Sequence, residues 1–260
     1  MDFSKRIAVV TGGVSGIGAA CSTLLASKGA QVVVWDVSDA ADVQCDIRNP
    51  AAIDDAIEAT ITRFGVPSVL VAGAGINGRR PLVDTTVEDW DRIMEVNARG
   101  TFFTMQAVTR AMISDGLDGV FTLVGSTAGT LTDPETVPYS VSKAGLNHLA
   151  RVAAVELGKY GIRVNLINPG PTVTPMTERS LGRKEYMDLV LETTPLHGVG
   201  TPALLAQAIV GIMEMDWVTG QTLDVDGGTS LVTPRGAVRA SFGAFTGGPN
   251  ATEYERKVPD

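Results

Sequence analysis

The sequence predicts an α/β fold in which a doubly wound parallel sheet forms a single domain. Short runs rich in β-branched residues alternate with longer segments of helical periodicity. The runs are apolar throughout, which is typical of parallel strands buried on both faces of a sheet. The first run leads directly into a glycine-rich turn and a helix, and 260 residues is a common length for one α/β domain.

Local signals set the expected elements. Gly29 ends the first helix, and Pro50 suits the first turn of the second because a helix needs no N–H there. The expected strands cover 7–10, 31–35, the region of 43, 69–71, 120–124, 164–167 and 223–225. The expected helices cover 19–28, 50–64, 88–114 and 138–159.

Composition excludes several classes of function. The net charge of −8 argues against a nucleic-acid surface, which requires clustered Lys and Arg. The N-terminal apolar run is too short for a secretory signal, and no stretch approaches about 18 uninterrupted apolar residues. We therefore expect a cytoplasmic protein without a membrane partner. Cys21 and Cys45 are expected to be reduced core residues, and with His148 and His197 they show no metal-ligand spacing.

The turn after the first strand has the character of a dinucleotide-binding loop. It runs from Gly12 through Ser15, Gly16 and Ile17 to Gly18, and a helix follows at once. Glycines at such a turn let the backbone approach a pyrophosphate, and the free N–H groups and dipole of the helix N-terminus favour its negative charge. The alternative is a turn that is merely tight.

Asp36, at the end of the second strand, favours NAD over NADP. A carboxylate at that place accepts hydrogen bonds from the adenosine ribose hydroxyls and repels a 2′-phosphate. No Lys or Arg occurs in the glycine turn or just after Asp36 to neutralise such a phosphate. The alternative is a solvated aspartate at a strand end.

Tyr139 and Lys143 are four residues apart in a predicted helix, so their side chains leave the same face one turn apart. The ordinary pKa of tyrosine, near 10, is too high for a base at neutral pH. A neighbouring ammonium favours the phenolate, so we expect Lys143 to lower the pKa of Tyr139. Taken alone, such a pair is usually two surface neighbours.

The order of the motifs resembles that of the short-chain dehydrogenase/reductase family, over about residues 5–230. The matching pieces are Thr11-Gly12-x-x-x-Gly16-x-Gly18, Asp46-Ile47, Asn97, Ser126, Tyr139-x-x-x-Lys143, Asn168-Pro169-Gly170, Val218-Thr219-Gly220 and Val225-Asp226-Gly227-Gly228. The resemblance implies a Rossmann-type fold with residues 1–230 as the catalytic domain.

The resemblance also implies a role for each residue. Tyr139 would be the acid/base, and Ser126 would orient the substrate oxygen. Lys143 would hold the nicotinamide ribose, and Asn97 would anchor a water in the proton relay. The remaining cofactor contacts implied are Ala72 and Gly73 after the fourth strand, Asp46 and Ile47 at the adenine, and Pro169, Gly170, Thr172 and Thr174 at the nicotinamide.

Two segments depart from the family pattern. Ala72-Gly73-Ala74-Gly75 stands where the family usually has Asn-Asn-Ala-Gly, so the asparagine side-chain bonds that support the neighbouring strands are absent. We expect less local rigidity near the cofactor. His197-Gly198 stands where the family often has Gly-Arg, and we interpret His197 as a loop residue.

These observations predict an NAD-dependent oxidoreductase that interconverts a secondary alcohol and a ketone. The alternatives are an NADPH-dependent 3-oxoacyl ketoreductase, which Asp36 disfavours, and a non-catalytic dinucleotide sensor or scaffold. A sensor would be expected to have lost part of the catalytic set, which is complete here. A related lyase or epimerase would usually have a longer chain with a second domain.

The expected substrate pocket is mainly apolar and suits a cyclic or hydrophobic alcohol. Its expected lining is Leu131, Thr132, Met176, Leu181, Tyr186, Met187 and Leu191. The resemblance also implies a homotetramer that pairs the helices at 88–114 and 138–159, with apolar candidates at Phe102, Phe103, Leu146, Leu149 and Val152. Residues 231–260 form a C-terminal extension, irregular or else covering the pocket or contacting a neighbouring subunit through Phe242, Phe245 and Tyr254.

Overall fold

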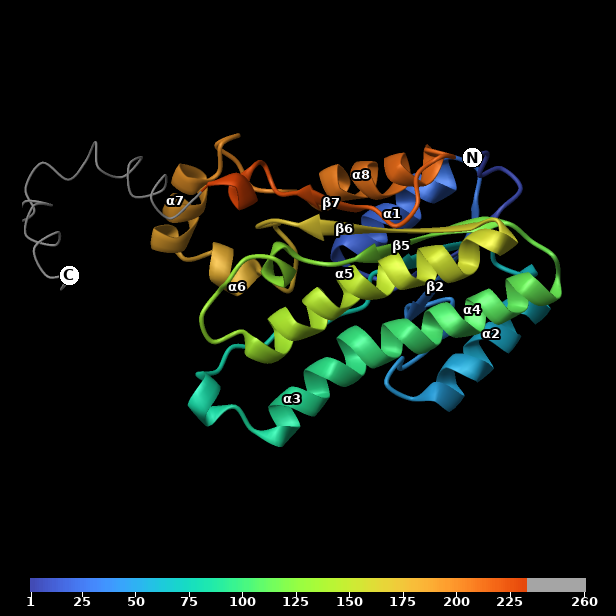
Figure 1. Ribbon diagram of the computed structural model, residues 1–260, viewed down its shortest axis with the longest axis horizontal. Coiled ribbons are helices and arrows are strands. Elements are labelled where there is room, and N and C mark those ends of the chain that lie inside the picture. Colours follow the sequence, from blue (N-terminus) through green and yellow to red (C-terminus); the bar gives the residue numbers. More distant parts are fainter. Residues whose placement is uncertain (233–260) are drawn as a thin grey trace, which may run out of the picture.

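The computed structural model describes residues 1–232, which form a seven-stranded, all-parallel sheet with helices on both faces (Figure 1). The strand order is β3-β2-β1-β4-β5-β6-β7. The strands are β1 (Ile7–Thr11), β2 (Gln31–Asp36), β3 (Val43–Gln44), β4 (Val69–Ala72), β5 (Gly119–Val124), β6 (Ile162–Pro169) and β7 (Thr222–Val225). The predicted doubly wound α/β domain is confirmed. The aromatic residues of the extension lie outside the described residues.

Most of the α-helices form two layers, one on each face of the sheet (Figure 1). The α-helices are α1 (Gly16–Ser27), α2 (Pro50–Phe64), α3 (Val87–Met94), α4 (Thr101–Ser114), α5 (Val137–Leu157), α6 (Glu178–Leu181), α7 (Lys184–Thr193) and α8 (Pro202–Glu214). α1 and α8 cover one face of the sheet, where Leu25 and Ile209 are fully buried with Val10. α2, α4 and α5 cover the other face, where Val108 and Leu146 lie in the core.

The predicted helix over 88–114 is interrupted. α3 and α4 are joined by a π-helical segment, η2 (Glu95–Gly100), which widens the helix around Asn97. Shorter 3₁₀ segments are η1 (Leu82–Asp84), η3 (Thr127–Gly129), η4 (Gly158–Tyr160) and η5 (Thr229–Leu231).

The helices beyond residue 170 were not predicted. α8 begins at an ordinary signal, since the Thr201 hydroxyl accepts a hydrogen bond from the Leu204 N–H at 3.3 Å and Pro202 occupies the first turn. α6 and α7 lie past the carboxyl end of β6 (Figure 1). Within residues 1–232, none of the helices combines the length and apolar character needed to cross a membrane.

The sheet gathers the candidate site at one edge. All seven strands are parallel, so their carboxyl ends lie along the same edge of the sheet. The strand order reverses between β1 and β4, and ligands of such sheets bind at this point of the edge. The glycine turn follows β1, Asp36 ends β2, Ala72 ends β4, Ser126 follows β5 and Pro169 ends β6. Cys21 and Cys45 are both buried, but in the cores on opposite faces of the sheet.

Candidate active site

The glycine turn forms a cradle that larger residues would fill. Gly12 and Gly16 have φ values of +67° and +55°, in the left-handed region that favours glycine. A Cβ on Gly18 would lie 2.2 Å from the carbonyl oxygen of Gly12, so α1 can approach the turn only because Gly18 has no side chain. The Ser15 hydroxyl does not cap α1. The N-terminus of α1 is therefore suited to bind a phosphate.

Asp36 lies directly beside this turn. Its carboxylate accepts hydrogen bonds from the backbone N–H groups of Val14 at 3.3 Å and Ser38 at 3.2 Å. The side chain of the next residue, Val37, is 63% exposed and uncharged. A carboxylate with no adjacent cation is the arrangement expected for binding ribose hydroxyls.

The segment after β3 brings Asp46 and Ile47 to the same edge. The Cys45 N–H donates to the Asp36 carbonyl at 2.8 Å, so Asp46 follows close to Asp36. Arg48 pairs with the Asp46 carboxylate at 2.6 Å, and these hydrogen bonds hold the pKa of Asp46 below its ordinary value. Ile47 is buried, and a Cβ on Gly100 would lie 2.7 Å from its carbonyl oxygen.

Thr11 supports the loop after β4. Its buried hydroxyl accepts hydrogen bonds from the Gly73 N–H at 3.1 Å and from the Ala74 N–H at 3.2 Å. Ala72, the last residue of β4, is 3% exposed. The expected loss of rigidity at the missing asparagines is thus offset by a side chain from the neighbouring strand, whose role the sequence did not reveal.

Ser126, Tyr139 and Lys143 come together between β5 and the start of α5. The Tyr139 side chain lies near that of Ser126, whose hydroxyl lowers the pKa of the phenol. The Lys143 ammonium lies 5.8 Å from the centre of the Tyr139 ring and donates to the Val124 carbonyl at 2.8 Å. Lys143 is 5% exposed, and this burial lowers its pKa to about 8.

The pKa of Tyr139 differs from the expectation. Burial raises the pKa of Tyr139, and the nearby Ser126 hydroxyl only partly opposes that effect. The physical reason is that desolvation penalises the phenolate, while the Lys143 ammonium is directed at the Val124 carbonyl rather than at the phenol oxygen.

Asn97 is fully buried in η2 and is hydrogen-bonded to α5, the helix that carries Tyr139 and Lys143. Its side chain accepts from the Ile76 N–H at 2.9 Å and donates to the Ile76 carbonyl at 2.9 Å and to the Ser142 hydroxyl at 3.0 Å. Ser142 in turn donates to the Tyr139 carbonyl at 2.7 Å. Asn97 therefore ties the loop after β4 to the first turns of α5.

Asn168 is a site residue that was recognisable from the sequence only as part of a motif. Its fully buried side chain accepts from the Ser126 N–H at 2.9 Å and donates to the Asp224 carboxylate at 2.9 Å. Pro169 and Gly170 follow it, and a Cβ on Gly170 would lie 2.5 Å from that of Asp226. Asn168 therefore fixes the backbone of the serine from the neighbouring strand.

The loop after β6 returns to the glycine turn. A Cβ built on Gly16 would lie 3.5 Å from the Cβ of Thr174. The Thr172 hydroxyl is buried and donates to the Gly170 carbonyl at 2.9 Å, while the Thr174 hydroxyl shares a hydrogen bond with Thr177 at 3.0 Å. Thr174 thus borders the cradle from the side of β6, and Thr172 lies in the loop that leads to it.

The residues expected to line a substrate pocket have different environments. Leu131 and Met176 are exposed by 37% and 46%, whereas Leu181 is buried at the end of α6. His197 lies in an exposed loop after α7, with a φ of 48° that is unusual for a residue with a side chain. In residues 1–232, no group of three or more His, Cys, Asp and Glu side chains could hold a metal ion.

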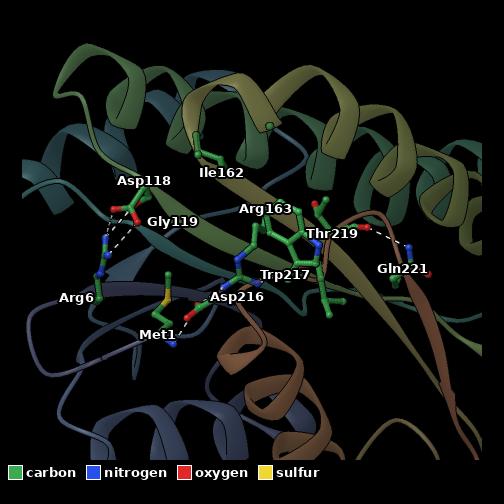
Figure 2. A pocket seen from close by; sticks show the side chains of 13 residues that line it. Met1, Arg6, Asp118, Gly119, Ile162, Arg163, Asp216, Trp217, Thr219 and Gln221 are labelled. Atoms are coloured by element: carbon green, nitrogen blue, oxygen red, sulfur yellow. Dashed lines mark hydrogen bonds and ion pairs between the residues drawn. The ribbon is translucent and has the colours of Figure 1, made fainter.

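A separate cavity of about 890 Å³ opens at the opposite edge of the sheet, where β5 and β6 begin (Figure 2). Arg6 is paired there with Asp118 at 2.9 Å, and the amino terminus with Asp216 at 3.2 Å. The Trp217 side chain at its rim is fully exposed. This cavity is remote from the catalytic set, because that set lies at the carboxyl ends of the strands.

Comparison with known proteins shows a match over most of the chain. A family model described as enoyl-(acyl carrier protein) reductase matches residues 12–230. A (3R)-3-hydroxyacyl-CoA dehydrogenase of Rattus norvegicus is 34% identical over 255 residues, covering 88% of this chain and 97% of the relative. A 2-(R)-hydroxypropyl-CoM dehydrogenase of Xanthobacter autotrophicus is 34% identical over 250 residues, covering 88% of this chain and 100% of the relative.

Among solved structures, a levodione reductase superposes with a TM-score of 0.83 at 28% identity, covering 89% of this chain and all of the other. The family match extends from the glycine turn to the segment after β7, the same range that carries the strand-end residues described above. The chain belongs to the short-chain dehydrogenase/reductase family and is an oxidoreductase that acts on hydroxyl or carbonyl groups.

Proposed function

We propose that this chain is an NAD-dependent oxidoreductase that interconverts a secondary alcohol and a ketone, with Tyr139 as the acid/base. The observation that carries the proposal is the buried Lys143, whose ammonium lies 5.8 Å from the centre of the Tyr139 ring and one helical turn along α5, with Ser126 close to the phenol. A buried ammonium is costly, so its presence beside a phenol and a hydroxyl favours a chemical role. A non-catalytic scaffold would have no use for this set.

The side chains of the site transfer one proton to or from the substrate oxygen. In the direction of oxidation, Tyr139 removes the hydroxyl proton of the alcohol, and Ser126 holds the same oxygen by a hydrogen bond. Burial raises the pKa of Tyr139, so its base form requires a positive charge nearby. The Lys143 ammonium lies 5.8 Å from the ring centre and, although it now donates to the Val124 carbonyl, is the charge that we propose for this role. Asn97 keeps the first turns of α5 in place. When bound, the nicotinamide ring accepts or returns the hydride.

The glycine cradle supports binding of the dinucleotide, and Asp36 supports NAD. Gly12, Gly16 and Gly18 leave room where a Cβ would collide or be strained, and the N-terminus of α1 favours a pyrophosphate. We expect turnover with NAD to exceed that with NADP by at least about tenfold, or about 1.4 kcal/mol. The double variant Asp36→Ala with Val37→Arg should narrow or invert the ratio. Equal use of both cofactors by the natural protein would contradict this role of Asp36.

The relatives named above support an alcohol that carries a further chemical group, whereas the exposed apolar side chains of Leu131 and Met176 support a cyclic or hydrophobic one. NADH formation at 340 nm should be followed across alicyclic, steroidal, sugar and hydroxyacyl thioester alcohols. A preference for NADPH with an oxoacyl thioester would instead identify the ketoreductase.

The catalytic assignment is tested at two residues. Tyr139→Phe removes one hydroxyl from a packed ring and should abolish oxidation while leaving NADH binding nearly intact. Lys143→Ala should weaken both activity and cofactor binding. A tenth or more of the natural rate in the Phe variant would exclude Tyr139 as the acid/base.

We also propose a homotetramer that pairs the outer faces of α4 and α5. Phe102 and Val152 are 43% and 42% exposed on these helices, which suits a contact surface, whereas Leu146 is buried against the sheet. A stable monomer in light scattering at micromolar concentration would refute the assembly.

A further inference from the structure

The π-helical segment η2 touches both ends of the proposed cofactor site. Asn97, inside the segment, is bonded to Ile76 and Ser142 on the catalytic side. Gly100, at its end, lies against Ile47 on the side proposed to bind adenine. Six residues therefore join two regions that are far apart in sequence.

The contact on the adenine side is direct. A Cβ on Gly100 would lie 2.7 Å from the Ile47 carbonyl oxygen and 2.8 Å from its Cγ1. No side chain fits between the two backbones. Since packed interiors hardly compress, a shift of residue 47 must be followed by η2.

Arg99 provides a second link to the same place. Its guanidinium pairs with Glu95 at 3.1 Å and donates to the Arg48 carbonyl at 3.2 Å. The backbone N–H of Arg48 donates to the Asp46 carboxylate at 3.0 Å, and its guanidinium engages both carboxylate oxygens. An adenine amino group that donates to Asp46 must share this carboxylate with Arg48. Adenine binding therefore affects Arg48, whose carbonyl accepts the hydrogen bond from Arg99.

On the catalytic side, η2 contacts the first turns of α5 and holds their backbone in position. Ser142 receives a hydrogen bond from Asn97 and gives one to the Tyr139 carbonyl. A Cβ on Gly75 would lie 3.3 Å from the Asn97 Oδ1 and 3.5 Å from the Lys143 Nζ, so these two groups flank the same short loop. A displacement of Asn97 thus reaches the helix that carries both catalytic side chains.

We propose that Arg99 and Gly100 are positioning residues, through which binding of the adenosine half of the dinucleotide at Asp46 sets the placement of Tyr139 and Lys143. The inference rests on the proposed function, because it takes the adenine to lie at Asp46 and Ile47. Binding of the adenosine half then increases kcat as well as the affinity for the cofactor. The increase in kcat depends on Arg99, although Arg99 does not contact the reacting atoms.

Hydrogen exchange with AMP tests this coupling without turnover. AMP should slow amide exchange at residues 46–48, where it binds, and also at residues 139–143. In Arg99→Ala the first protection should remain and the second should be lost. Arg99→Lys retains a positively charged donor and should keep part of the protection at residues 139–143. Arg110→Ala, on the exposed face of α4, should keep all of that protection. Protection at 46–48 without protection at 139–143 in the natural protein, or no protection by AMP at all, would overturn the proposal.

Kinetics provide the second readout. Nicotinamide mononucleotide lacks the adenosine half, and AMP added in trans should raise its kcat by about fivefold or more, the low end of couplings between sites. Arg99→Ala should remove this activation, and with NAD it should lower kcat more than it raises KM. Full activation by AMP in Arg99→Ala would refute the coupling. Lack of NAD turnover with every alcohol, together with the expected exchange pattern, would refute the proposed function and leave the coupling intact.

Discussion

Replacing Lys143 with methionine should change how stability depends on pH. The side chain is 5% exposed, and burial lowers its pKa from 10.5 to about 8. Between these two values the unfolded chain binds a proton that the folded chain does not. The free energy of unfolding of the natural protein must therefore rise with pH across this window.

The magnitude follows from the two pKa values. Linkage between pH 7 and pH 10, with pKa values of 10.5 unfolded and about 8 folded, gives a rise of about 2–3 kcal/mol. Lys143→Met has no titrating group at this position and lacks that rise. At pH 7 the variant avoids burying a charge, although it leaves the Val124 carbonyl without its present partner.

Urea unfolding of both proteins at pH 7, 8, 9 and 10 measures the effect. The free energy of unfolding of Lys143→Met, relative to that of the natural protein, should fall by about 2–3 kcal/mol from pH 7 to pH 10. Lys159→Met makes the same substitution at an exposed lysine and controls for the change in net charge. A difference between the natural protein and Lys143→Met that stays constant with pH would refute the argument that burial shifts this lysine.

Three further substitutions test the backbone and the strand-end contacts. Gly18→Ala places a Cβ against the Gly12 carbonyl and should cost about 1–3 kcal/mol and weaken NADH binding in fluorescence titration, whereas Gly145→Ala, with open space around it, should be tolerated. His197→Gly relieves a left-handed backbone and should raise the free energy of unfolding by about 1 kcal/mol in urea; an unchanged midpoint would contradict the strain. Asn168→Ala leaves the Ser126 N–H unpaired and should lower kcat about tenfold with little change in the KM for NAD; unchanged kinetics would refute a positioning role for Asn168.

The sequence predicted the sheet and most of the strand-end residues, because strand periodicity and turn chemistry are local. Gly12 and Asp36 were identified from the turn and the strand end in which they stand, whereas the role of Ser126 came from the family resemblance. The structure brings the three to one edge because parallel strands all end there. The extent of α2 was also predicted, since Pro50 is a local signal for the first turn of a helix.

What the sequence did not show depends on contacts between distant segments. The Thr11 hydroxyl supports the loop after β4, and Asn168 supports Ser126 from a neighbouring strand. Neither contact leaves a periodic signal in the chain. The same holds for the pKa of Tyr139, which burial raises and which therefore could not be deduced from the spacing to Lys143 alone.

The π-helical segment has a geometric consequence. A π turn accommodates more residues than an α turn, and each residue of a regular helix advances about 100° around the axis. Shortening η2 by one residue while α4 keeps its place in the core would rotate the chain before the deletion by roughly that angle. A deletion after Asn97 would therefore turn this side chain away from Ser142 and carry α3 with it. In this chain the length of η2, and not only its amino acids, determines which way Asn97 points.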